Sequence, residues 1–243
     1  KSEVNSVLYT LKSKRRANVD SELRWSLLGK TDGSDFARAP DSGSVSRPAE
    51  TSYSAQPPTP VSRSEAIVWT PEQNEVVTAP SDRLFLVDSG PGTGKTAVAC
   101  ARVAHLLGQG IPASQVLMVS FTRAAVHEIK QRIGQHAGPE KTWTLRIATL
   151  DQTAFSLGIG VGQEFETLMQ GFEENIDNAI RLLSQDAPAV KRFLGGLRHV
   201  LVDEAQDITG LRIDLITSIF DSLPSGCGIT VFADPAQSIY GFT

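Results

Sequence analysis

Cysteine is nearly absent from this chain of 243 residues, which contains only Cys100 and Cys227. Two cysteines are too few for a disulfide framework or for a zinc site with four cysteine ligands, so we expect reduced thiols in a cytoplasmic protein. Long apolar runs are also missing, since none approaches the roughly 18 residues that a membrane span requires. The first residues lack a basic segment followed by an apolar one, so no signal peptide is indicated.

An excess of basic residues is absent too. The 23 Lys and Arg residues stand against 27 Asp and Glu residues, a net charge of -4. This balance excludes a protein that binds nucleic acid through bulk charge alone, although a local groove remains possible. Apolar residues at 40% and charged residues at 21% are typical of a soluble globular chain with a sizeable core.

Composition divides the chain into three parts. Residues 1–38 form an N-terminal segment of unknown role, in which a short basic amphipathic helix is predicted. Such a helix either docks on a neighbouring domain, which we favour, or touches nucleic acid or a membrane surface. Residues 39–64 are rich in Ser and Pro, which predicts a disordered linker. Residues 65–243 form the main domain, with a short insertion at about 158–197.

Within the main domain, short apolar runs alternate with segments of helical periodicity. The runs predict strands at 83–88, 116–120, 145–149, 200–203 and 229–233. The periodic segments predict helices at 96–107, 122–133 and 211–220. This alternation is typical of an α/β fold with a mostly parallel sheet covered by helices on both faces. The carboxyl ends of the strands would share one edge, where we expect the functional site.

A glycine-rich segment follows the first of these strands and opens the first helix. Its glycines let backbone N–H groups turn inward, and the helix start adds partial positive charge, so the segment predicts a phosphate site of the P-loop (Walker A) type. Lys95 would contact the β- and γ-phosphates of a nucleotide, and the Thr96 hydroxyl would bind magnesium. The pattern departs from the strict motif only at its first position; its residues are Ser89, Gly90, Pro91, Gly92, Thr93, Gly94, Lys95 and Thr96.

The strand at 200–203 ends in two acidic residues, Asp203 and Glu204. Both carboxylates would lie at the same sheet edge as the phosphate site. Asp203 would hold magnesium, directly or through water, and Glu204 would orient and deprotonate the attacking water.

The run Asp-Glu-Ala-Gln-Asp at 203–207 resembles the box that marks superfamily 1 helicases of the UvrD/Rep type, and further motifs follow in the family's order. The resemblance implies a RecA-like P-loop NTPase fold that uses ATP and Mg²⁺. It implies that Gln73 reads the adenine edge, that Gln237 senses the γ-phosphate and that Tyr240 stacks on a base. It also implies contacts with single-stranded DNA from Phe121, Thr122, Arg123 and Thr149.

Two departures accompany the resemblance. The family commonly has Thr-Phe-His where this chain reads Thr149-Leu150-Asp151, and an acid at that place would repel phosphates. The family also carries a large helical insertion where this chain has only about forty residues. In that shortened segment we expect the apolar side chains to pack, namely Phe165, Leu168, Met169 and Phe172.

The resemblance further implies a second motor domain after residue 243 that supplies catalytic arginines, and 3′-to-5′ movement on single-stranded DNA or at a junction with duplex. An arginine finger is worth roughly 10³ to 10⁵ in rate. On this interpretation the 243 residues are half of a motor, which would bind ATP weakly and hydrolyse it very slowly alone.

Two other functions are weighed against the helicase or translocase. A nucleotide switch in a larger DNA repair or defence assembly, without unwinding, is compatible with Asp151 and with the unmatched N-terminal segment. A P-loop kinase or transporter ATPase is disfavoured, because neither explains the segment around Gln73 or the run from Gln237 to Tyr240.

Overall fold

The computed structural model describes residues 23–25, 68–138, 140, 143–160, 171–185 and 187–234. Contacts group the chain into one unit of residues 1–26 and 69–243 and another of residues 27–68, and the latter lies, apart from Val68, outside the described residues. The predicted N-terminal helix, the linker, Gln237 and Tyr240 also lie outside them, as do Phe165, Leu168 and Met169.

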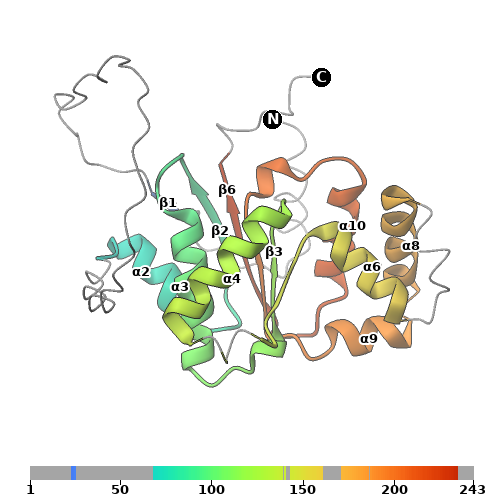
Figure 1. Cartoon of the computed structure of the whole chain (residues 1–243), viewed down its shortest axis with the longest axis horizontal. Coiled ribbons are helices and arrows are strands. Elements are labelled where there is room, and N and C mark those ends of the chain that lie inside the picture. The colour runs from blue at the N-terminus through green and yellow to red at the C-terminus, as the bar shows by residue number, and fades with distance from the viewer. Residues whose placement is uncertain are drawn as a thin grey trace, which may run out of the picture. The chain divides into compact units, whose positions relative to one another are not determined.

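The described strands form one sheet in which every neighbouring pair is parallel (Figure 1). Its order is β1-β2-β6-β5-β3-β4, and β5 and β6 lie at its centre. The bounds are β1 Leu23–Trp25, β2 Leu84–Ser89, β3 Val116–Val119, β4 Arg146–Ala148, β5 His199–Val202 and β6 Gly228–Ala233. The predicted α/β class and the five predicted strands are therefore confirmed, while β1 is an additional strand that pairs with β2.

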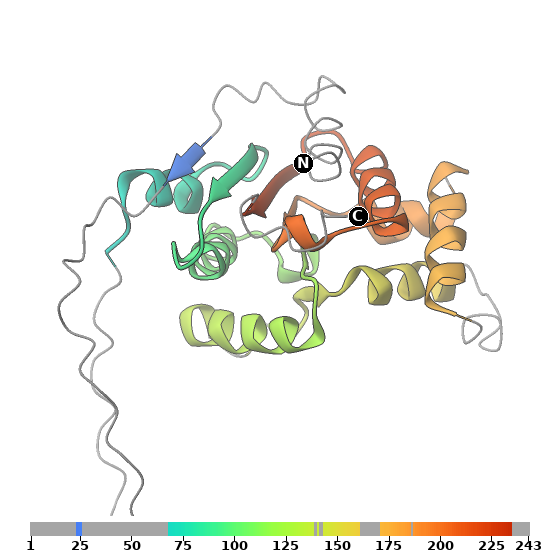
Figure 2. The ribbon, with the colours of Figure 1, turned by 90° about the horizontal axis from the view of Figure 1, so that it is seen from above.

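Helices cover both faces of the sheet (Figure 2). One face carries α2 (Pro71–Thr78), α3 (Lys95–Gly108) and α4 (Arg123–Ala137). The other carries α6 (Leu150–Gly160), α8 (Phe172–Ser184), α9 (Pro188–Leu194) and α10 (Leu211–Asp221). Two short 3₁₀ turns, η1 (Ala113–Gln115) and η2 (Ala205–Asp207), complete the described elements. None of the helices in the described part of the chain has the length and apolar character needed to cross a bilayer.

The two-residue period of the strands builds a separate apolar core on each face. In β3, Met118 packs with α2, α3 and α4, whereas its neighbours Leu117 and Val119 pack with the helices of the opposite face. Successive strand side chains point to opposite faces, so a strand buried on both sides is apolar throughout. These strands therefore appear in the sequence as continuous apolar runs.

The prediction that Phe172 packs is wrong, since its side chain is 65% exposed. Phe172 lies one turn before the buried Ile176 on α8. At the first residue of the helix, however, that face borders an open groove between α4, α6 and α8 instead of the core.

One buried polar side chain, that of Arg102, links helices α2 and α3. Arg102 of α3 is fully buried, and its guanidinium donates to the carbonyl oxygens of Val77, Ala79 and Pro80 at the end of α2. Burial lowers the pKa of Arg102 to about 10. The group thus replaces the hydrogen bonds that the last carbonyls of a helix lack, and it ties α2 to α3.

Candidate functional site

The phosphate loop occupies the turn between β2 and α3, as the sequence predicts. Gly92 and Gly94 have φ angles of 72° and 82°, in the left-handed region that favours glycine. Gly94 is the N-cap of α3, and no side chain caps this helix start. The first N–H groups of α3 and its positive dipole end are therefore directed at the loop, an arrangement suited to phosphate.

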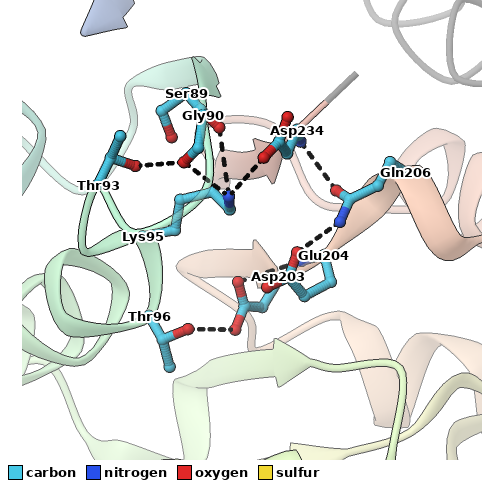
Figure 3. Close-up of polar contacts among 9 residues, drawn as sticks. All are labelled: Ser89, Gly90, Thr93, Lys95, Thr96, Asp203, Glu204, Gln206 and Asp234. Carbon is cyan, nitrogen blue, oxygen red and sulfur yellow. Dashed lines mark hydrogen bonds and ion pairs between the residues drawn. The ribbon is translucent and has the colours of Figure 1, made fainter. Parts of the chain in front are cut away.

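The side chain of Lys95 folds back over the loop and is only 7% exposed. Its Nζ donates to the carbonyl oxygens of Ser89 and Gly90, both at 3.2 Å, and forms an ion pair with Asp234 Oδ2 at 3.4 Å (Figure 3). Thr93 Oγ1 donates to the Gly90 carbonyl at 2.8 Å, which closes the turn. The ammonium group thus lies within the loop, where a nucleotide's phosphates would bind.

Thr96 and Asp203 meet across the site, as predicted for a magnesium pair. Thr96 Oγ1 donates to Asp203 Oδ2 at 3.3 Å, although the two residues are 107 positions apart in the chain. Asp203 is 2% exposed, and burial, followed by the nearby charge of Glu204, raises its pKa to about 6. A hydroxyl and a carboxylate are hard oxygen ligands that suit Mg²⁺. A cation would also offset the charge of a carboxylate that burial disfavours, so these residues fit the metal.

Glu204 has an unusual backbone conformation. Its φ angle of 53° makes it the one non-glycine residue with positive φ in the described part of the chain. Its N–H donates to Asp203 Oδ1 at 3.1 Å, and its carboxylate accepts a 2.5 Å hydrogen bond from Gln206 Nε2. Backbone strain of this kind is often found at functional sites, and here the bonds to Asp203 and Gln206 hold the residue in place.

Gln206 and Asp234 are site residues to which the sequence interpretation assigned no role. Gln206 Oε1 accepts from the backbone N–H of Asp234 at 2.9 Å, and Asp234 pairs with Lys95. Both residues are almost fully buried. A continuous series of polar contacts therefore runs from Lys95 through Asp234, Gln206, Glu204 and Asp203 to Thr96, the residue next to Lys95 in the chain (Figure 3). Each lies in a motif that the sequence shows, but only the fold reveals the contact between them.

Gln73 lies beside the phosphate loop, with its amide engaged at both ends. Its Oε1 accepts from the Thr70 N–H at 3.0 Å in a capping box that starts α2, and its Nε2 donates to the Thr93 carbonyl at 3.0 Å. The structure thus brings Gln73 to the phosphate loop. Its contact with adenine stays a prediction.

The residues predicted to contact DNA follow β3 and β4 at the same sheet edge. Phe121 is 37% exposed and Arg123 is exposed at the first turn of α4. Thr122 caps α4, because its Oγ1 accepts from the Ala125 N–H. Thr149 is buried, and its hydroxyl accepts from the Gln152 N–H at the start of α6, a structural role.

Asp151 does not stand alone at this edge, because its carboxylate forms an ion pair with Arg212 of α10. The Arg212 NH2 group lies 2.8 Å from Asp151 Oδ1. The sequence alone indicated an acid that repels phosphates. The structure shows an acid whose charge is matched by a neighbouring cation.

Comparisons with known proteins agree with this geometry. The family model described as "UvrD/REP helicase N-terminal domain" matches residues 69–168 and 163–243. ATP-dependent DNA helicase UvrD1 of Mycobacterium tuberculosis is 26% identical over 192 residues, which cover 69% of this chain and 24% of the relative.

Two further relatives match over shorter stretches. ATP-dependent DNA helicase Rep of Escherichia coli is 41% identical over 76 residues, 31% of this chain and 11% of the relative. A putative ATP-dependent DNA helicase of Bacillus subtilis, YjcD, is 42% identical over 66 residues, 27% of this chain and 9% of the relative. The chain thus spans about a quarter or less of the length of these relatives. Since the family model matches most of the chain, this protein belongs to the UvrD/Rep helicase family, and its described part is the N-terminal helicase motor domain.

Proposed function

We propose that this domain binds ATP with magnesium and hydrolyses it as the first motor domain of a helicase or translocase that moves on single-stranded DNA. The observation that carries the proposal is the continuous series of polar contacts from Lys95 through Asp234, Gln206, Glu204 and Asp203 to Thr96 (Figure 3). It supports the proposal because it gathers an ammonium group, a hydroxyl and two carboxylates around one phosphate loop, the groups that phosphate binding, metal binding and water activation would need.

Phosphate binding is the task of the loop and of Lys95. The inward N–H groups and the start of α3 attract the negative oxygens. Lys95 already faces one carboxylate and two carbonyl oxygens, and a polyphosphate offers it a more strongly charged partner. Thr96 and Asp203 would hold magnesium, which neutralises phosphate charge when bound.

Activation of water is assigned to Glu204. A general base must lie within hydrogen-bond distance of the proton that it accepts. The left-handed backbone of Glu204 and its bond from Gln206 fix one carboxylate oxygen, and the other would accept the proton of the attacking water. Gln237, outside the described residues, is proposed as the γ-phosphate sensor.

Single-stranded DNA would run along the same edge of the sheet. The partly exposed ring of Phe121 offers a stacking surface, and the exposed Arg123 offers a cation for phosphate. Stacking of a base on an aromatic side chain is worth roughly 1–3 kcal/mol. Tyr240, also outside the described residues, is proposed as a second stacking residue. Movement in the 3′-to-5′ direction and a second motor domain are proposals for the whole protein.

The test is single-turnover ATP hydrolysis by the whole protein, in excess over ATP, measured with and without single-stranded DNA. We expect magnesium-dependent hydrolysis that DNA accelerates. Glu204→Gln should keep affinity for ATP but slow hydrolysis by roughly 10²–10⁴-fold, the range for loss of a general base. Glu173→Gln, on the exposed side of α8, is the matched control. ATP binding with no effect of DNA on hydrolysis would favour the nucleotide switch, and no ATP binding would overturn both.

A further inference from the structure

The ion pair between Asp151 and Arg212 is the feature of the DNA edge that the family motifs do not explain. Asp151 is the second residue of α6, which follows β4, and Arg212 is the second residue of α10, which follows β5 and η2. Both side chains are partly exposed, at 26% for Asp151 and 30% for Arg212. They therefore lie at the surface of the carboxyl edge, where the proposed DNA path runs.

The position of Arg212 is electrostatically unfavourable without an anion. A cation in the first turn of a helix faces the positive end of the helix dipole. The N-cap of α10, Gly210, provides no side-chain hydrogen bond. Asp214 adds one negative charge to this turn, but the carboxylate that pairs with Arg212 is that of Asp151, at 2.8 Å. A phosphate group could take the place of this carboxylate.

Asp151 borders two hollows at this edge, and Arg212 borders the smaller of them. A small hollow contains Phe121, Asp151 and Arg212, with space of only about 10 Å³, close to the minimum for one water molecule. A larger groove contains Arg123, Lys130 and again Asp151. Among the described residues lining the two, Asp151 is the one acidic side chain, beside three cations. Because Asp151 accepts from the Arg212 NH2 group, a nucleotide phosphate that bonds to this group would compete with Asp151.

We propose that Asp151 is a built-in competitor of DNA: it occupies Arg212, a phosphate ligand, until a phosphate of single-stranded DNA displaces it. This inference rests on the proposed function. Partly exposed ion pairs are weak, so the exchange is readily reversible. The contact would weaken DNA binding without blocking it, which suits a motor that must release each phosphate as it moves.

The test is a double-mutant cycle on the affinity for a fluorescent single-stranded oligothymidylate. Asp151→Asn keeps the side-chain shape and releases Arg212, so the affinity should rise about two- to fivefold, the equivalent of one surface ion pair. In the Arg212→Gln background the same change should have no effect, because there is no cation to release. Adding Arg212→Gln to the Asp151→Asn variant should also reduce the slope of log affinity against log salt by about 0.7, the value for one single-strand phosphate.

Two controls separate this mechanism from simpler ones. Asp82→Asn removes the same charge from the turn before β2, at the opposite edge of the sheet, and should leave affinity unchanged. Arg212→Lys keeps the cation and should retain most of the affinity, which covers the case that Arg212→Gln perturbs α10. Thermal unfolding of each variant reports on the fold.

The outcomes are distinct. Equal tightening by Asp151→Asn in both backgrounds, no tightening at all, or the same gain from Asp82→Asn would overturn the competitor role and leave the proposed function intact. If neither the natural sequence nor any variant binds the oligonucleotide, the DNA part of the proposed function is overturned, and this inference with it.

Discussion

Lys95 shows how a single residue can be prepared for a ligand by its surroundings. A buried ammonium group is costly unless it is paired, and here two carbonyl oxygens and the Asp234 carboxylate surround it. These partners hold the side chain inside the loop. A nucleotide's phosphates would bind at this loop, within reach of the ammonium group.

Replacing Lys95 with Ala should therefore weaken binding of a fluorescent ATP analogue by about 10- to 100-fold, since a hydrogen bond to a charged group is worth roughly 1.5–3 kcal/mol. Equilibrium titration in the presence of magnesium measures this. Lys130→Ala, which removes an exposed cation from α4, should bind the analogue normally. Unchanged affinity in Lys95→Ala would remove the residue from the phosphate site.

His199 is a buried residue whose protonation is linked to stability. Its Nδ1 lies 2.6 Å from the Ser81 carbonyl, which can only accept, so Nδ1 carries the proton and Nε2 accepts from the Thr230 hydroxyl at 2.9 Å. Burial, with a smaller effect from the charge of Arg102, lowers the pKa of His199 to about 3. The imidazole is therefore neutral in the folded protein.

The sign of the pH effect follows from this pKa. Because the unfolded histidine titrates near 6.5, the unfolded state binds more protons than the folded state between about pH 6.5 and pH 3. The contribution of His199 to stability should be complete above pH 6.5 and fall below it, by up to about 1.4 kcal/mol per pH unit. Asp203, whose pKa is raised from 3.8 to about 6, acts in the opposite direction between those two values, so the comparison with a His199 variant isolates the histidine. Urea unfolding at pH 7 and pH 4.5 tests this. His199→Gln should lose less stability than the natural sequence between these pH values, and identical dependence in the two proteins would contradict the assignment.

At the scale of elements, the start of β6 is packed tightly against the segment that leads into β2. A Cβ atom on Gly228 would contact the carbonyl oxygens of Ser81 and Arg83 and the ring of His199. The two carbonyl oxygens belong to the backbone between α2 and β2, so they cannot move aside as the end of a flexible side chain could. The close approach lets the Ile229 N–H bond to the Arg83 carbonyl at 3.1 Å.

Gly228→Ala should consequently destabilise the domain by about 1–3 kcal/mol or more, the usual cost of overpacking. The matched control is Gly108→Ala at the end of α3, where an added Cβ meets nothing within 4 Å. That change should be neutral or stabilise by up to about 1 kcal/mol. Chemical denaturation gives the free energy of unfolding of each variant. Equal values for the two would show that the segment before β2 shifts to make room for the added Cβ atom.

At the scale of the whole molecule, the site joins elements from distant parts of the chain. Lys95 and Thr96 start α3, Asp203 and Glu204 follow β5, and Asp234 follows β6. A nucleotide bound among them would connect these segments, and a ligand that binds only the folded state raises its stability.

Magnesium and ATP at about 100 times the dissociation constant should thus stabilise the domain by about 2.7 kcal/mol. For a domain of this size the melting temperature should rise by roughly 5–10 °C. GTP should stabilise less, because a Gln73 amide oriented for adenine does not match the guanine edge. Differential scanning fluorimetry with both nucleotides measures this. Equal shifts that persist in Gln73→Ala would exclude the residue from base recognition.

Much of the fold was predictable from local patterns. Strands buried on both faces appear as apolar runs, and α3, α4 and α10 show helical periodicity, so their predicted bounds differ from the observed ones by at most a few residues. Helices α2, α6, α8 and α9 were not predicted. For α2 and α6 a capping box was available in the sequence, because a Thr precedes each helix and a Gln follows that Thr three residues later.

The sequence by itself determined the α/β class, the phosphate loop and the pair of carboxylates, because each depends on residues close together in the chain. Only the tertiary structure decided which distant groups meet. The Lys95–Asp234 and Asp151–Arg212 ion pairs span 139 and 61 positions, and the exposure of Phe172 depends on where α8 meets α6. The order of the strands in the sheet creates such contacts. A one-dimensional pattern shows the residues that carry chemistry, but not which of their charges the folded chain places together.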